Sequence, residues 1–132
     1  MEDMIIELSN GVKVINTSPH PFTFEDGTVV PPCGTTLNAT FEEVQWTNQA
    51  GNQVNAGSGA IELLQSRKVP QAAGLEFVQS VPSEVLILGS AIAAEAYGYP
   101  VVMAKPTAET AGRGTPPADK RMRIAQFTAW GL

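Results

Sequence analysis

Three cationic side chains and two aromatic ones lie close together near the end of the sequence. The cations are Lys120, Arg121 and Arg123, and the aromatic residues are Phe127 and Trp130. A guanidinium presents its N–H groups in a planar fork that matches phosphate oxygens, and an aromatic face stacks on a nucleobase. This combination predicts a site for a small anionic nucleotide. A solvated basic helix face is the alternative interpretation.

The charge distribution places this group on a cationic end of an acidic chain. The 132 residues carry a formal net charge of −5. Residues 1–104 hold three basic and eleven acidic side chains, whereas residues 105–132 hold five basic and two acidic ones. An acidic body argues against duplex nucleic acid as a partner, because duplex binding draws its affinity from many Lys and Arg contacts to phosphates. Arg113 belongs to the cationic end, and we expect it to contact the ligand's phosphates.

A second anion site is suggested by a strand-turn-helix pattern. The apolar run 85–88 is followed by Gly89 and Ser90 and then by the alanine-rich segment 91–97. Free N–H groups and the positive dipole end of a helix attract anions, and glycine allows a ligand to approach closely. The alternative is that Ser90 only caps its own helix, which Gly98 ends.

Residues suited to catalysis are scarce. The single histidine, His20, and the single cysteine, Cys33, each follow a proline and are typical of a turn residue and a small buried residue. Glu42 and Glu43 are adjacent, and neighbours on a strand point to opposite faces. No phosphate loop, dinucleotide fingerprint or nucleophile elbow occurs. We expect no enzyme activity, cofactor or metal, and a phosphodiesterase using His20 is the less favoured alternative.

Short strands are predicted to position these residues. The Asn10-Gly11 pair lies between two alternating apolar runs and predicts a hairpin, because both residues tolerate the positive φ of a type I′ turn. Asp26-Gly27 predicts a second turn after a strand that carries Phe22 and Phe24 on one face.

The remaining segments predict a mixture of strands, loops and helices. We expect a strand with a bulge at Glu42-Glu43 over residues 37–47, a loop or hairpin tip over 48–59, either a short helix or a strand within 60–74, a strand over 75–81, a strand over 85–88, a helix over 91–97, a strand over 100–103, a surface loop over 107–117 and a short helix over 117–123. Together these predict one α+β domain, mostly antiparallel β-sheet with two short helices in the C-terminal third.

Composition also limits the disulfides, the membrane contacts, the location and the oligomeric state that we expect of this chain. One cysteine excludes an internal disulfide, and the acidic start does not resemble a secretory signal. The apolar run 85–94 is shorter than the roughly 20 residues that cross a bilayer. We therefore expect a cytoplasmic protein without membrane contact. A charged fraction of 16% is low for a monomer, so we also expect a homo-oligomer.

Residues 14–22 resemble a sequence opening found in small proteins of bacteriophages and prophages. The shared pattern is Asn-[Leu/Thr]-[Thr/Ser]-Pro-His-Pro, here within Val-Ile-Asn-Thr-Ser-Pro-His-Pro-Phe. The turn 32–34, the Gly-Ser junction within 88–96 and the Pro-Pro-Ala-[Asp/Glu]-Lys-Arg-Met-Arg stretch of 116–123 resemble those proteins as well. The resemblance covers most of the chain except residues 48–74.

The size, β-rich body and helical end are also similar to the phage Thoeris anti-defence sponges. That resemblance implies an oligomer that holds glycocyclic ADP-ribose or cyclic oligonucleotides at subunit interfaces, through arginines and a stacking aromatic residue. The expected function is therefore to sequester nucleotide immune signals in the cytoplasm of the bacterial host. His20, in the shared opening, joins the cationic and aromatic residues as a candidate ligand contact. A virion or structural accessory protein that forms homo-oligomers is the alternative.

Overall fold

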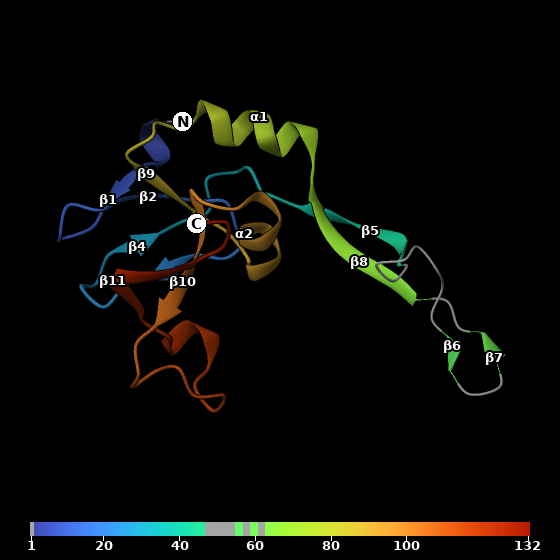
Figure 1. The fold of residues 1–132 in the computed structure, drawn as a ribbon. Coiled ribbons are helices and arrows are strands. Elements are labelled where there is room, and N and C mark those ends of the chain that lie inside the picture. Colours follow the sequence, from blue (N-terminus) through green and yellow to red (C-terminus); the bar gives the residue numbers. More distant parts are fainter. Residues whose placement is uncertain (1, 47–54, 57–58, 61–62) are drawn as a thin grey trace.

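A mixed five-stranded sheet forms the body of the computed structural model (Figure 1). The structure describes residues 2–46, 55–56, 59–60 and 63–132. The strand order is β1 (Ile6–Glu7), β2 (Lys13–Asn16), β9 (Val85–Leu88), β10 (Val101–Pro106) and β11 (Met122–Ala129). The three central strands run parallel, and the two edge strands pair antiparallel. With sheets that are largely antiparallel and helices in the C-terminal half, the predicted α+β class is confirmed.

Two tight hairpins form where the turn residues predict them. β1 pairs with β2, with Ile6 opposite Val14, and Gly11 has a φ of 88°. β3 (Phe22–Thr23) pairs with β4 (Val29–Val30), and Gly27 also has a φ of 88°. Glycine adopts this positive φ without the steric cost that a Cβ atom would bring. Both hairpins are therefore confirmed. The first turn is not the predicted type I′ turn, because Gly11 has a positive φ and Asn10 does not.

One helix crosses over between two parallel strands. α2 (Ala91–Tyr97) connects β9 to β10, as parallel neighbours require. The Oγ atom of Ser90 accepts a hydrogen bond from the Ala93 N–H at 3.1 Å, and Gly98 ends the helix with a φ of 73°. The predicted helix and both of its caps are confirmed.

The second helix lies where a strand is predicted. α1 spans Ala72–Ser80, directly after strand β8 (Leu63–Pro70), so segment 60–74 contains both kinds of element and the predicted strand over 75–81 is wrong. The strand prediction arises because Leu75 and Phe77 are two positions apart, as apolar residues on one face of a strand are. Phe77, Val78 and Val81, however, have the spacing of one helical face, and all three pack in the core.

The predicted helix over 117–123 is also wrong beyond its first turn. Only Pro117–Asp119 forms a short 3₁₀ turn, and Lys120 is already extended, with φ −71° and ψ 140°. From Met122 the chain pairs with β10 and completes the sheet. Tertiary strand pairing therefore overrides the local preference for a helix that begins at proline. A further 3₁₀ turn spans Glu2–Met4.

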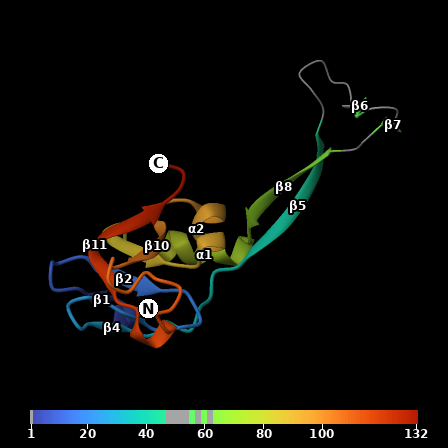
Figure 2. The same cartoon turned by 90° about the horizontal axis from the view of Figure 1, so that it is seen from below.

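A two-stranded ribbon extends away from the body in both views (Figures 1 and 2). β5 (Ala39–Trp46) pairs with β8 in an unbroken antiparallel register, from Ala39 opposite Pro70 to Trp46 opposite Leu63. The predicted bulge at Glu42-Glu43 is therefore wrong. Within residues 39–44 and 63–70, whose burial is described, neither face of the ribbon is buried, so apolar residues there need not stay on one face. In the predicted loop 48–59, β6 (Asn55–Ala56) pairs with β7 (Gly59–Ala60), and the rest lies outside the described residues.

The central sheet is buried on both faces. Along β9, Ile87 belongs to one apolar cluster and Leu88 to the other, and Val101 and Val102 divide in the same way on β10. The first cluster contains Ala93 and Ala94 of α2 and is covered by α1. The second contains Phe24 and Val30 of the β3–β4 hairpin. Burial on both faces explains why residues 85–88 form a continuous apolar run.

Candidate functional site

Asn16, Thr17 and Ser18, at the start of the Asn-Thr-Ser-Pro-His segment, form a buried hydrogen-bond network. Asn16 has no exposed surface. Its Nδ2 atom donates to the carbonyl oxygens of His20 at 2.8 Å and Val30 at 3.1 Å, and its Oδ1 atom accepts from the Ser18 N–H at 2.9 Å and the Ser18 hydroxyl at 2.8 Å. The Thr17 hydroxyl donates to the Leu88 carbonyl at 2.6 Å. This part of the motif holds β2, β4 and β9 together.

A pocket of about 520 Å³ lies beside an irregularity in β11. The pairing passes from Ala104 opposite Phe127 to Pro106 opposite Met122, so β11 contains three extra residues across this interval. Arg123, Ala125 and Gln126 lie within this interval, residues 123–126, and line the pocket. Bulges commonly re-aim side chains beside functional sites.

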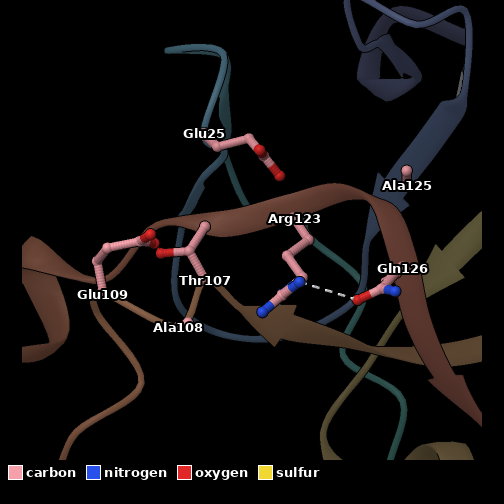
Figure 3. A pocket seen from close by; sticks show the side chains of 7 residues that line it. All are labelled: Glu25, Thr107, Ala108, Glu109, Arg123, Ala125 and Gln126. Carbon is pink, nitrogen blue, oxygen red and sulfur yellow. Dashed lines mark hydrogen bonds between the residues drawn. The ribbon is translucent and has the colours of Figure 1, made fainter.

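One guanidinium and two carboxylates face this bulge pocket. Arg123 donates from Nε to the Pro106 carbonyl at 3.2 Å and from Nη1 to Oε1 of Gln126 at 3.1 Å. Figure 3 shows Gln126 on one side of Arg123 and Thr107 and Glu109 on the other, with Glu25 above the strand. The Ile124 N–H donates to Oε2 of Glu25 at 3.0 Å. The formal charge of these side chains is negative, so the bulge pocket does not favour an anion.

A second pocket combines two of the predicted site residues. It has a volume of about 360 Å³ and lies between segment 20–23 and segment 117–122. His20 and Lys120 both line it, although they are a hundred positions apart in the sequence. Its other lining residues are Pro21, Phe22, Thr23, Pro117, Ala118 and Met122. We call this the His20–Lys120 pocket, and none of its lining residues carries a carboxylate.

The remaining predicted cations lie outside the His20–Lys120 pocket. Arg121 is half-buried, and its Nη1 atom donates to the carbonyl oxygens of Ala118 at 3.2 Å and Lys120 at 3.1 Å. These bonds shape the backbone that forms one wall of the pocket. Arg113 is exposed in the loop between β10 and the 3₁₀ turn at 117–119.

The two predicted stacking residues pack against the core. Phe127 contacts the second cluster, with its ring centroid 6.3 Å from that of Phe24. Trp130 packs against the first cluster, on the other face of the sheet. Both rings are half-buried, and they therefore contribute to packing.

The start of α2 is closed by its own cap. The Ser90 hydroxyl is used by the Ala93 N–H. A Cβ atom at Gly89 would lie 3.2 Å from Val101, 3.3 Å from Ala93 and 3.5 Å from Thr17. Close packing against the neighbouring side chains therefore accounts for this glycine.

Several residues that line the two pockets could not be recognised from the sequence. Phe22, Pro117 and Met122 line the His20–Lys120 pocket, but their types are those of ordinary core and turn residues. Glu25 precedes the Asp26-Gly27 turn, and nothing in its spacing indicates that it meets β11.

No protein-family model matches this chain, and no curated protein and no solved structure matches it either. The functional argument therefore rests on the side chains and their surroundings. In the part of the chain that the structure describes, no three His, Cys, Asp or Glu side chains are grouped to hold a metal ion. Across the same residues, no helix has both the length and the apolar character needed to span a bilayer.

Proposed function

We propose that this protein binds a small anionic nucleotide without transforming it, and that the His20–Lys120 pocket is the binding site. One observation carries the proposal: His20 and Lys120 line the same pocket, and the rest of its lining is mostly apolar and contains no carboxylate. Its volume of about 360 Å³ falls in the range of small-molecule pockets.

Each part of the pocket suits one part of a nucleotide. The Lys120 ammonium and the His20 imidazole supply hydrogen-bond donors for phosphate oxygens. The ring of Phe22 and the nearby prolines offer apolar surface for a base and sugar. In this assignment the aromatic contact to the base is Phe22. It replaces Phe127 and Trp130, which the sequence suggested, because their rings pack in the core.

The proposal that the nucleotide is bound but not hydrolysed is supported by the separation of His20 and Cys33, the two candidate catalytic residues. His20 lines the His20–Lys120 pocket, whereas Cys33 lines a different one, with Ile15 and Phe77 among its neighbours. The Cys33 thiol lies 3.4 Å from the Thr35 carbonyl. A nucleophile and its base need to be within hydrogen-bond reach of each other.

In this proposal the protein is a phage-encoded sponge for nucleotide immune signals, such as glycocyclic ADP-ribose or cyclic oligonucleotides, in the cytoplasm of the bacterial host. Calorimetry with a panel of these messengers tests it. We expect at least one to bind with Kd below about 10 μM, and Lys120→Ala to weaken that binding by roughly tenfold or more. Lys105→Ala, which removes an exposed lysine from β10, is the matched control.

Binding of no messenger by the wild type would refute the proposal. Equal binding by the Lys120→Ala and Lys105→Ala variants would refute the choice of pocket. Nucleotide recovered intact after prolonged incubation is the expected result, and hydrolysis that stops in His20→Ala would instead indicate a phosphodiesterase.

A second candidate function, a virion or structural accessory protein, is favoured by the exposed β5–β8 ribbon. Its apolar side chains and open strand edges suit contacts between copies. Mass spectrometry of purified virions separates the two functions, because a sponge acts in the infected cell and does not need to enter the particle.

A further inference from the structure

The β5–β8 ribbon is unusually exposed for a structural element. The residues whose burial is described, 39–44 and 63–70, are all at least partly exposed. Phe41 is 61% exposed, Leu64 52% and Leu63 40%. A two-stranded ribbon by itself is marginally stable in water, and added strands or apolar packing stabilise it. The ribbon therefore has the properties of an element that is completed by another chain.

Among the residues that the structure describes, no further strand pairs with either long edge of the ribbon. Within the described residues, β5 pairs only with β8, and β8 only with β5. Each outer edge therefore presents backbone N–H and C=O groups that a further strand can pair with. The charges and apolar residues on the two strands decide which strand fits.

The two strands carry opposite charges at the same level of the ribbon. β5 carries Glu42 and Glu43, and β8 carries Arg67 and Lys68. Glu42 and Arg67 form an ion pair at 3.0 Å, and Lys68 pairs with Glu95 of α2 at 2.9 Å. Pairing β5 with β5 of another copy would bring glutamates together, and pairing β8 with β8 would bring cations together. Pairing β5 with β8 brings opposite charges together, which favours it.

We propose that the outer edge of β5 in one copy pairs with the outer edge of β8 in a second copy, in antiparallel orientation. Glu42 of one copy then lies beside Arg67 of the next, as it does within a single ribbon. The exposed Phe41 and Leu64 each gain a neighbouring strand. Because each copy uses two different edges, the contact is head-to-tail and repeats into a ring or a filament. This inference does not depend on nucleotide binding.

Charge reversal with complementation tests this pairing. We expect Glu42→Arg and Arg67→Glu each to weaken association by roughly tenfold in analytical ultracentrifugation. Mixing the two variants should restore association, because the basic β5 edge of one then meets the acidic β8 edge of the other. The double variant Glu42→Arg/Arg67→Glu keeps both edges complementary and should associate as the wild type does. Lys105→Glu on β10 is the control for reversal of an exposed charge.

Hydrogen exchange of the wild type provides a second test that needs no variant. We expect amides in residues 39–46 and 63–70 to become more protected as protein concentration rises, while the five-stranded sheet does not change. A wild type that stays monomeric at all concentrations overturns the proposal. It is equally overturned if mixing restores nothing, or if association proceeds without added protection of the ribbon.

Discussion

The backbone N–H of Ser9 donates to Oδ2 of Asp26 at 2.9 Å, so one carboxylate joins the turns of two separate hairpins. The other oxygen of Asp26 accepts from the Thr28 N–H, also at 2.9 Å. These backbone hydrogen bonds, the Ser9 bond first, hold the pKa of Asp26 well below its usual range. The β3–β4 hairpin, which carries one wall of the His20–Lys120 pocket, is thereby fixed to the first hairpin.

Acid should weaken this link. A carboxylate whose pKa is lowered on folding contributes stability above its unfolded pKa of about 3.9, and that contribution is lost as the pH falls through the folded pKa. We expect Asp26→Asn to be less stable than the wild type at neutral pH, and the difference to shrink below about pH 4. Urea unfolding at a series of pH values measures it. A difference that stays constant with pH would contradict this assignment, and Asp119→Asn is the control for an exposed aspartate.

Asn16→Ala should strongly destabilise the fold. The substitution removes the buried hydrogen bonds of the Asn16 side chain with the Val30 carbonyl and the Ser18 N–H, and its part-buried bond with the His20 carbonyl, which keeps the Ser18 hydroxyl as a donor. Each unpaired group costs about 1–3 kcal/mol, and relaxation reduces the sum, so we expect a loss of at least about 2 kcal/mol. Urea denaturation measures it. Asn38→Ala, at an exposed asparagine, should cost within about 0.5 kcal/mol, and equal effects of the two substitutions would argue against a structural role for the motif.

Gly74→Ala should also destabilise the protein, through a clash with Tyr97. A Cβ atom at Gly74 would overlap the Tyr97 hydroxyl, which donates to the Asn38 carbonyl at 2.7 Å and accepts from the Gln71 N–H at 3.1 Å. Forced displacement of a packed side chain typically costs about 1–3 kcal/mol. Gly112→Ala has no neighbour within 4 Å and should be neutral or slightly stabilising. Thermal unfolding compares the two, and equal melting temperatures would show that Tyr97 moves freely.

Substitution of Arg123 should affect stability, whereas substitution of Arg113 should not. The sequence favours phosphate contacts for both, but the Arg123 guanidinium bonds Pro106 and Gln126 across the bulge. We expect Arg123→Ala to cost about 1 kcal/mol, and Arg123→Lys to cost less because an ammonium keeps one of the two bonds. The exposed Arg113→Ala should lie within about 0.5 kcal/mol of wild type. If Arg123→Ala lowers nucleotide affinity without changing stability, the result would instead indicate that Arg123 contacts the nucleotide.

Turn and cap residues made much of the fold predictable. Gly11, Gly27 and Gly98 have a positive φ where the chain turns, and Ser90 caps its helix, as these residue types favour. The secondary-structure predictions were wrong where tertiary contacts determine the local conformation. Residues 72–80 form a helix because this conformation lets Phe77, Val78 and Val81 pack together in the core. Residues 122–129 form a strand because they pair with β10.

The candidate site was predictable only in part. His20 and Lys120 stand out by type, but only the hairpin fold brings them to one pocket. The packing of Phe127 and Trp130 could not be inferred from their proximity to arginines, because the three extra residues of β11 set which side chains face the core. A bulge of this kind leaves no signature in residue types.

The Tyr97 hydroxyl binds the chain both where it enters the ribbon, at Asn38, and where it leaves, at Gln71. The two ends of the ribbon therefore meet at a single atom of α2, and the body does not depend on how long the segment between them is. Insertions or deletions made in equal numbers on β5 and β8 would change the reach of the ribbon while its base stayed in place. We therefore expect the length of the ribbon to be changeable by design while the five-stranded sheet beneath it is retained.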